Sequence, residues 1–184
     1  MSPPLPTAGR LLITGPSNAG KTRLTARALE RWVLENGAEG VAVLEFAPEI
    51  ERDGVLLGGR LSRFTGLPEE AWVGTLDANA PRAEGETEEE AHELARKNAR
   101  GGMELIESMP SARAVFVNDA TIPFQHAGDV EALLAACEGA ELVVMNAFAG
   151  DELGSDDPIS RRECDSRRQL EAWADTHERL ADED

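Results

Sequence analysis

The sequence predicts an α/β fold with a mainly parallel central sheet. Short apolar runs that end in polar or glycine-rich turns indicate buried strands, and longer segments with a 3.6-residue apolar spacing indicate helices. The two kinds of segment alternate, and parallel strands need such crossover helices between them. A length of 184 residues is typical of one compact domain, so we expect a single domain over residues 1–184.

The first βαβ unit joins a strand at residues 10–14 to a helix at residues 21–35. Asn36-Gly37 is expected to end this helix with a left-handed cap. A second buried strand follows at residues 41–46. The helix between them is the expected right-handed crossover to a parallel neighbour.

Prolines and glycines interrupt the periodicity over residues 47–81, apart from a short strand expected at residues 72–76. We expect this irregular region, to about residue 85, to form a lid or an acceptor pocket. Thr87 and Glu90 form a capping box that opens a helix to about residue 109, with Gly101-Gly102 as the place for a bend.

The alternation then continues to the end of the chain. We expect strands at residues 114–118 and 141–146, helices at residues 128–138 and 159–174, and an edge strand at residues 176–180. The acidic end, at about residues 181–184, is expected to be a mobile tail.

The charge balance is strongly acidic, with 35 acidic and 18 basic side chains and a formal net charge of −17. Such a chain repels phosphate backbones and anionic membrane surfaces, so we expect neither a nucleic-acid nor a membrane partner. No apolar run approaches the ~20 residues of a membrane span, and we expect a soluble, cytoplasmic protein. Two explanations of the acidity stay open, a salt-rich cytoplasm and the codon bias of a GC-rich genome.

Eight residues between the first strand and the first helix match the phosphate-binding pattern of a glycine, four residues and Gly-Lys-Thr: Gly15, Pro16, Ser17, Asn18, Ala19, Gly20, Lys21 and Thr22. Backbone amides of such a loop surround a phosphate chain, so Gly15 and Gly20 must allow close approach and unusual backbone angles. The helix start adds a partial positive charge. We expect Lys21 to contact the β- and γ-phosphates and the Thr22 hydroxyl to bind Mg²⁺.

Through Gly15, Gly20, Lys21 and Thr22, and through the βαβ pattern around them, the chain resembles the P-loop NTPase superfamily. The resemblance implies a three-layer P-loop NTPase fold and a bound nucleoside triphosphate with Mg²⁺. In its size and in the amino-terminal position of the loop, the chain is also similar to the ATP:corrinoid adenosyltransferases.

ATP is favoured over GTP by default. The Asn-Lys-x-Asp run with which GTPases of this superfamily bind guanine is missing after the strand that ends at Asn146. Residues 151–154 imitate the Asp-x-x-Gly switch of those proteins, but they come late and do not directly follow a strand.

Two acidic residues at strand ends are candidates for positioning magnesium during catalysis. Asp119 directly follows the 114–118 strand and is expected to act through water. Glu45 is the rival, because ligands gather at the carboxyl ends of strands in open α/β sheets. No glutamate follows Asp119, unlike the Asp-Glu pair of many motor-type ATPases, so vigorous hydrolysis is not expected.

Positive charge over the triphosphate is expected from Arg60, Arg63 and Arg82 in the irregular region. The alternative for each is a surface arginine or a local ion pair. His126 and Asn146 are further candidates for the cleft, with an exposed loop histidine and a turn-forming asparagine as the alternatives.

The expected function is Mg²⁺-dependent nucleoside triphosphate binding, with group transfer to a small-molecule acceptor held by the irregular region. The transfer is of the kinase or the nucleotidyl/adenosyl transferase type. The alternative is a slowly hydrolysing, nucleotide-responsive regulatory or binding protein. Whether the chain forms a homodimer stays open.

Overall fold

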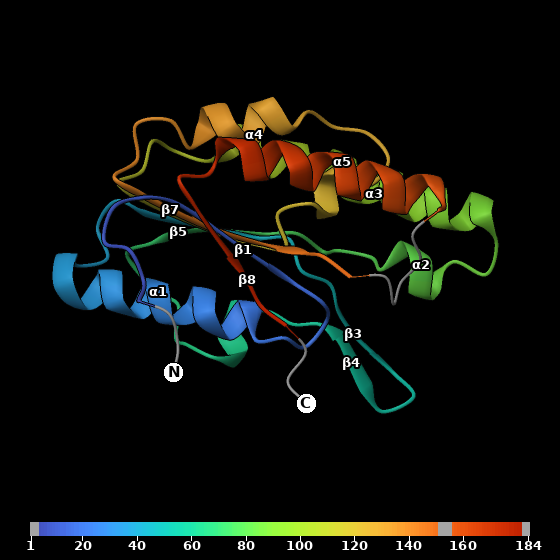
Figure 1. Ribbon diagram of the computed structural model, residues 1–184, viewed down its shortest axis with the longest axis horizontal. Helices are drawn as coiled ribbons and strands as arrows, with labels where there is room; N and C mark the ends of the chain where they lie inside the picture. The colour runs from blue at the N-terminus through green and yellow to red at the C-terminus, as the bar shows by residue number, and fades with distance from the viewer. Residues whose placement is uncertain (1–3, 151–155, 182–184) are drawn as a thin grey trace.

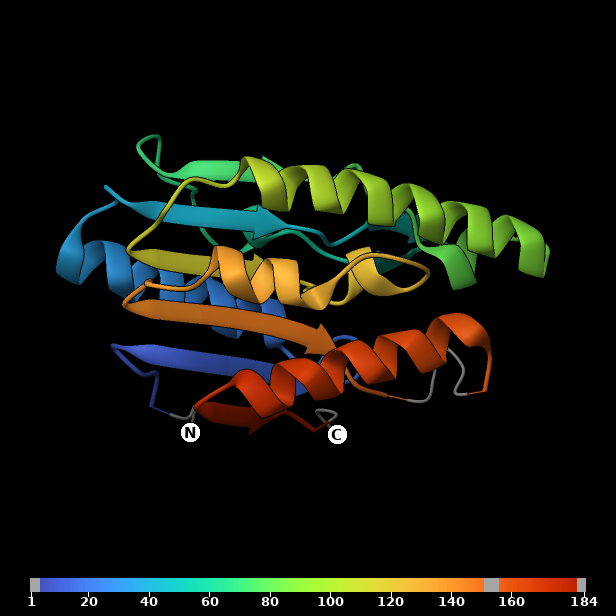
Figure 2. The same cartoon turned by 90° about the horizontal axis from the view of Figure 1, so that it is seen from above.

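A computed structural model describes residues 4–150 and 156–181 of the chain. A six-stranded sheet with the order β5-β2-β6-β7-β1-β8 lies at its centre, and all neighbouring strands in it are parallel. Helix α1 covers one face of this sheet, and helices α3, α4 and α5 cover the other (Figures 1 and 2). The fold is therefore α/β with a parallel central sheet, as the sequence predicts.

The elements follow one another along the chain as β1 (Gly9–Gly15), α1 (Lys21–Asn36), β2 (Val41–Glu45), β3 (Glu49–Arg52), β4 (Val55–Gly58), the 3₁₀ turn η1 (Leu61–Arg63), β5 (Trp72–Thr75), α2 (Pro81–Glu84), α3 (Glu88–Ser108), β6 (Ala114–Asn118), the 3₁₀ turn η2 (Ile122–Phe124), α4 (Val130–Ala136), β7 (Leu142–Phe148), α5 (Pro158–Trp173) and β8 (Thr176–Arg179). The expected acidic tail, from residue 182 on, and the switch-like residues 151–154 lie outside the described residues. None of the helices in the described part has the length and apolar character needed to cross a bilayer.

Side chains of the central strands alternate between two hydrophobic cores. Leu11 and Ile13 of β1 belong to the core that includes Trp32 of α1. Leu12, between them, belongs to the core that includes Leu170 of α5. Because both faces of the sheet are covered, the strands are apolar throughout, and this made them recognisable in the sequence.

The strand order corrects one expectation from the sequence. β2 does not neighbour β1, because β6 and β7 lie between them. The crossover through α1 therefore passes over two strands. Pairing between strands distant in sequence depends on contacts that the local pattern does not encode.

The region at residues 47–81 is more ordered than the sequence suggested. β3 and β4 form an antiparallel hairpin. Asp53 and Gly54 turn it with φ angles of 53° and 75°, as a two-residue hairpin turn requires. The Asp-Gly pair was the available signal, and the expectation of an irregular segment was wrong here. The short strand expected near Trp72 is confirmed as β5.

Helix α3 begins as the capping box predicts. The Thr87 hydroxyl accepts a hydrogen bond from the Glu90 amide at 3.1 Å, and the Glu90 carboxylate accepts one from the Glu86 amide at 2.9 Å. The helix runs without interruption through Gly101-Gly102. A Cβ on Gly102 would lie 2.6 Å from the Cβ of Pro123. The second glycine therefore allows close packing of α3 on η2.

We expect opposite effects from two neighbouring substitutions in α3. Gly102→Ala should lower the free energy of unfolding by about 1–3 kcal/mol, because α3 must move away from Pro123. Gly101→Ala places its Cβ against only the Leu76 Cδ1 atom, at 2.7 Å, and that side chain can turn away. Gly101→Ala should thus be neutral or stabilising by up to about 1 kcal/mol. Urea denaturation measures both, and equal effects would contradict this packing.

Candidate functional site

The glycine loop (residues 15–22) turns the chain from β1 into α1. Asn18 and Gly20 have φ angles of 62° and 89°. A Cβ on Gly20 would touch nothing within 4 Å, so glycine is required there by the backbone angle. Gly15 differs from the expectation, because it is part of β1 and its φ is not positive. A Cβ on Gly15 would lie 2.7 Å from the Leu180 carbonyl oxygen, so this glycine permits packing against the chain after β8.

Lys21 lies at the start of α1, with a relative exposure of 8%. Its Nζ donates a hydrogen bond to the Pro16 carbonyl oxygen at 2.5 Å and so spans the glycine loop. No side chain caps the first turn of α1, because Gly20 precedes it. The loop therefore combines an ammonium group with the positive end of a helix, an arrangement that favours an anion.

A cavity of about 720 Å³ lies over the glycine loop, within the range of about 300–1,000 Å³ typical of small-molecule sites. It is lined from the loop by Ser17, Asn18, Ala19, Gly20, Lys21 and Thr22. Two segments that follow strands also reach it, one through Pro48 after β2 and the other through Asp119, Ile122 and Gln125 after β6. The cavity thus lies at the carboxyl ends of the strands.

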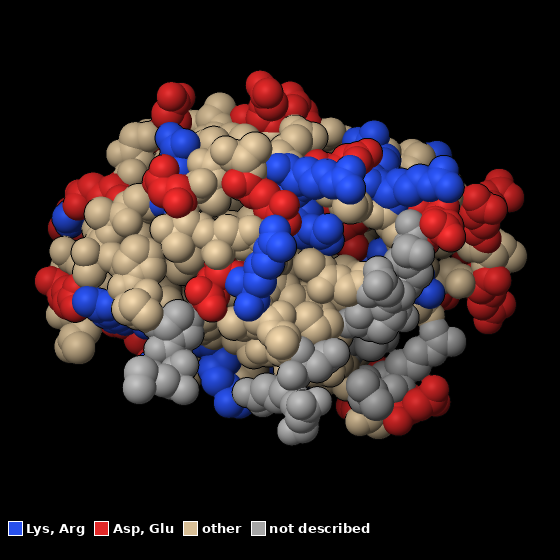
Figure 3. Space-filling view, viewed as in Figure 1, with Lys and Arg blue, Asp and Glu red and all other residues tan. Residues whose placement is uncertain are grey.

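The lining of this cavity is basic, in contrast to the chain as a whole. It includes Lys21, Arg23, Arg27, Arg63 and Arg82, against the acidic Asp119 and Glu163. Figure 3 shows acidic side chains at the upper, left and right margins of one face of the molecule, with basic side chains along α5 and near the centre. Basic side chains are therefore concentrated around the cavity, although the chain carries a net charge of −17.

The side chain that meets Thr22 is Asn118, the residue before Asp119. The Thr22 hydroxyl donates to Asn118 Oδ1 at 3.2 Å. Asn118 Nδ2 donates to Glu45 Oε1 at 2.7 Å and to the Gly59 carbonyl at 2.9 Å. Sequence reasoning missed Asn118, whose place at the end of β6 was the available signal.

Asp119 also reaches the cavity, on a backbone with φ of 57°. Its amide donates to Asn146 Oδ1 at 2.9 Å. Burial raises the pKa of the Asp119 carboxyl to about 6, against the opposing effect of Lys21. Asn146 itself is fully buried and is not among the described residues that line the cavity. It connects strand ends and is neither a cleft residue nor a turn.

Glu45, the rival of Asp119, is buried and is not among the described residues that line the cavity. Its carboxylate accepts hydrogen bonds from the Leu61 amide at 2.8 Å and the Ala47 amide at 3.2 Å, besides that from Asn118. Burial raises its pKa to about 7. Glu45 therefore anchors the chain before η1 to the edge of the sheet.

The structure brings two of the three candidate arginines to the cavity. Arg63 lines it and forms an ion pair with Glu49 Oε1 at 2.5 Å. Arg82 lines it from α2. Arg60 is not among the described lining residues, and its Nε is buried without a hydrogen-bond partner in the described part. Both of these candidate arginines have ion-pair partners, as the alternative interpretation anticipated.

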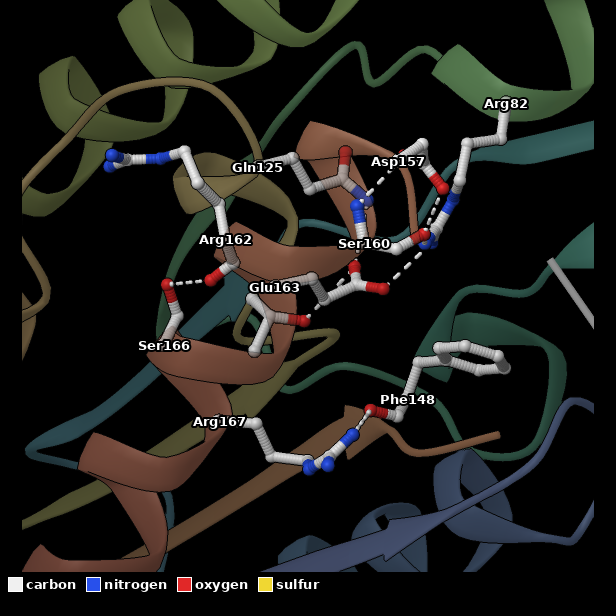
Figure 4. A network of polar contacts seen from close by, with 10 residues as sticks. Arg82, Gln125, Phe148, Asp157, Ser160, Arg162, Glu163, Ser166 and Arg167 are labelled. Atoms are coloured by element: carbon white, nitrogen blue, oxygen red, sulfur yellow. Dashed lines mark hydrogen bonds and ion pairs between the residues drawn. The ribbon is translucent and has the colours of Figure 1, made fainter. Parts of the chain in front are cut away.

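Arg82 is held by a buried polar network that joins α2 to α5 (Figure 4). Its guanidinium donates to Glu163 Oε1 at 2.7 Å and to Ser160 Oγ at 2.8 Å. It also lies 5.6 Å from the ring centroid of Phe148. Gln125 Nε2 donates to Glu163 Oε2 at 2.7 Å. Sequence reasoning missed Glu163, because nothing in α5 distinguishes it from the exposed acidic residues around it.

His126 is not among the described residues that line the cavity. It lies against α3, with its ring centroid 5.5 Å from that of His92. Burial and nearby Arg96 lower its pKa. Of the two interpretations of His126, the structure therefore does not favour the one that assigns it to the cleft.

The sequence matches no protein-family model and no curated protein. Within the described residues, no group of three or more His, Cys, Asp or Glu side chains could hold a metal ion by itself.

Glu45 should make stability depend on pH. Its pKa rises from 4.5 to about 7 on folding, so the folded state retains this proton to higher pH than the unfolded state. The contribution of Glu45 to the free energy of unfolding is complete below about pH 4.5. It is lost as the pH rises through about 7, which lowers that free energy by about 3 kcal/mol. Glu45→Gln should remove this loss, which urea denaturation at pH 5, 6, 7 and 8 measures relative to wild type.

Glu49→Gln is the matched control for this prediction. Arg63 lowers the pKa of Glu49, so its contribution is lost only below pH 5 and should not change over the tested interval. Parallel stability profiles for wild type and Glu45→Gln would contradict the assignment.

Proposed function

We propose that this chain is a P-loop protein that binds a nucleoside triphosphate with Mg²⁺ and transfers a group from it to a small-molecule acceptor. ATP is the proposed nucleotide. One observation carries the proposal: in a chain of net charge −17, the glycine loop with Lys21 and Thr22 lines a cavity whose described lining also includes Arg23, Arg27, Arg63 and Arg82. Such a cavity favours a compact polyanion through local contacts.

The order of elements supports the same proposal. The loop follows a buried parallel strand and opens a helix of 16 residues, the context in which the phosphate-binding pattern has its physical meaning. Helices on both faces of the sheet accord with a three-layer P-loop NTPase fold (Figure 1). Two central strands lie between β1 and β2, so the carboxyl ends of four adjacent strands face the cavity region.

The residues present fit a magnesium ion. Mg²⁺ commonly takes one or two protein ligands and completes its coordination with phosphate oxygens and water. The Thr22 hydroxyl donates its proton to Asn118, so a lone pair of its oxygen is available to a cation. The Asp119 carboxylate in the cavity would orient the water ligands. When bound, the ion would neutralise charge on the β- and γ-phosphates.

In a phosphoryl transfer, the γ-phosphorus exchanges its bond to the β–γ bridging oxygen for a bond to the acceptor oxygen. The nucleoside diphosphate leaves, and the proton of the acceptor passes to solvent. Lys21 would bind the β- and γ-phosphates. Arg82, held by Glu163 and Ser160, would supply fixed positive charge from the opposite wall. A nucleotidyl or adenosyl transfer would use the same cavity.

A second candidate function is a slowly hydrolysing, nucleotide-responsive regulatory protein. It is favoured by Asn118, because the group bonded to Thr22 is a neutral amide and not a carboxylate. Acceptor-stimulated ATP turnover distinguishes the two candidates. A transferase consumes ATP many times faster with its acceptor, whereas a regulatory protein responds to a protein partner.

Lys21→Ala should lower the affinity for Mg·ATP by about 10- to 100-fold, the scale of a lost charge-assisted hydrogen bond. The fold should persist, because Lys21 faces the cavity. Calorimetric titration measures the affinity, and Lys97→Ala on the exposed part of α3 is the matched control. Equal affinities of Lys21→Ala and wild type would contradict the proposed phosphate contact.

Asp119→Asn should lower Mg²⁺-dependent turnover by at least about tenfold while changing nucleotide affinity far less, because the carboxylate acts on the metal and not on the base or sugar. Steady-state turnover at increasing Mg²⁺ concentrations measures this effect. Glu45→Gln serves as the comparison. If only Glu45→Gln alters the Mg²⁺ dependence, the roles of the two carboxylates are reversed.

A further inference from the structure

Phe64 is an exposed aromatic side chain inside the cavity. Among the described residues, the exposed large hydrophobic side chains are Leu34, Phe64 and Val73, with relative exposures of 87%, 41% and 37%. Of these, Phe64 alone lines the cavity. Leaving an aromatic ring in water forgoes the stabilisation that its burial would bring, so its place in a ligand-sized cavity points to a ligand that covers it.

One guanidinium group lies near this ring, and a second arginine precedes it in the chain. The Arg23 guanidinium carbon lies 5.5 Å from the Phe64 ring centroid, within the range of a cation–π contact. Arg63 precedes Phe64 in the chain, lines the cavity and is oriented by Glu49. An aromatic ring with one guanidinium group near it and a second arginine lining the same cavity suits a planar ring that carries an anionic group.

The position of Phe64 is fixed by the buried chain beneath it. Its amide donates to the Leu61 carbonyl at 2.9 Å. Leu61 is fully buried, and its amide donates to the Glu45 carboxylate at 2.8 Å. The ring therefore stands on a segment tied to the edge of the sheet, which lowers the cost of ordering it on binding.

The topology places Phe64 on the side where an acceptor must bind. In a loop of this pattern, the lysine reaches the β- and γ-phosphates and the threonine meets their metal ion. Thr22 contacts Asn118 of β6, so the terminal phosphate lies toward β6. The chain comes to η1 from β2, which is the neighbour of β6, so Phe64 lies on the same side of β1 as the terminal phosphate. Leu180, which follows β8, lines the cavity on the opposite side of β1.

We propose that Phe64, Arg23 and Arg63 bind the acceptor, and that this acceptor is a ring-bearing anion such as a nucleoside monophosphate. The ring stacks on Phe64, and the guanidinium groups of Arg23 and Arg63 bind its phosphate or carboxylate. This assignment rests on the proposed function, because it takes the position of the terminal phosphate from the glycine loop.

Calorimetric titration of the protein loaded with Mg²⁺ and β,γ-imido-ATP tests the assignment. The probes are AMP, GMP, CMP and UMP, with ribose 5-phosphate as the probe that lacks a base. At least one monophosphate should bind, and ribose 5-phosphate should bind about tenfold more weakly, the scale of one base–aromatic stacking contact.

Phe64→Ala should weaken the binding of that monophosphate about tenfold and leave the affinity for β,γ-imido-ATP unchanged. Phe64→Tyr should retain the affinity, because it keeps the ring. Leu34→Ala, which removes an exposed side chain of α1 outside the cavity, should change neither affinity.

The possible failures are distinguishable. If β,γ-imido-ATP binds and no monophosphate does, the acceptor assignment is wrong while the proposed function stands. If Phe64→Ala weakens β,γ-imido-ATP instead, the ring on Phe64 is the nucleotide base, and the acceptor assignment is again wrong. If β,γ-imido-ATP does not bind to wild type at all, the proposed function itself fails.

Discussion

The side-chain amide of Asn118 is the contact on which the arrangement at the sheet edge depends. It is fully buried and bonds Glu45 of β2, the Gly59 carbonyl after β4, Thr22 of α1 and Asn146 of β7. Every one of these groups would lose a partner with it, and buried polar groups without partners are costly. The glycine loop, the segment leading to η1 and the neighbouring strand end are therefore positioned together.

A second constraint is the contrast between global and local charge. A net charge of −17 opposes long anionic polymers, yet salt screens such repulsion beyond about 8–10 Å. Within that distance an anion in the cavity would be attracted by the loop amides, by Lys21 and by the lining arginines. Arg63 and Arg82 are each neutralised in part by a carboxylate, which fixes their guanidinium groups in place. We therefore propose that the cavity takes small anions and not long anionic polymers.

Local patterns in the sequence predicted most of the elements, because buried parallel strands are apolar throughout and the capping box of α3 has characteristic residues. Gly37 ends α1 as expected, but with a ψ of 173° and not in the left-handed conformation. The glycine loop could also be predicted, because its glycines, Lys21 and Thr22 form a local pattern in the sequence. The strand order could not, since it depends on contacts between distant segments. The β3–β4 hairpin was missed although Asp53-Gly54 signals such a turn. At the site, the pattern indicated Asp119, but the residue that accepts the hydrogen bond from Thr22 is Asn118, one position earlier. Glu163 could not be predicted, because its role depends on the contact between α5 and Arg82, which lie far apart in the sequence.

The proposed function depends on an anion site formed by the backbone of the glycine loop. The most direct measurement is an NMR titration of the backbone amides with inorganic tripolyphosphate, which carries no base, sugar or ring. An anion site in the loop predicts saturable shifts centred on the amides of Gly20, Lys21 and Thr22, with little change along β5 at the far edge of the sheet. If those loop amides stay unchanged, or if shifts of equal size spread over the arginines of the surface, the loop is not an anion site and the functional account is wrong.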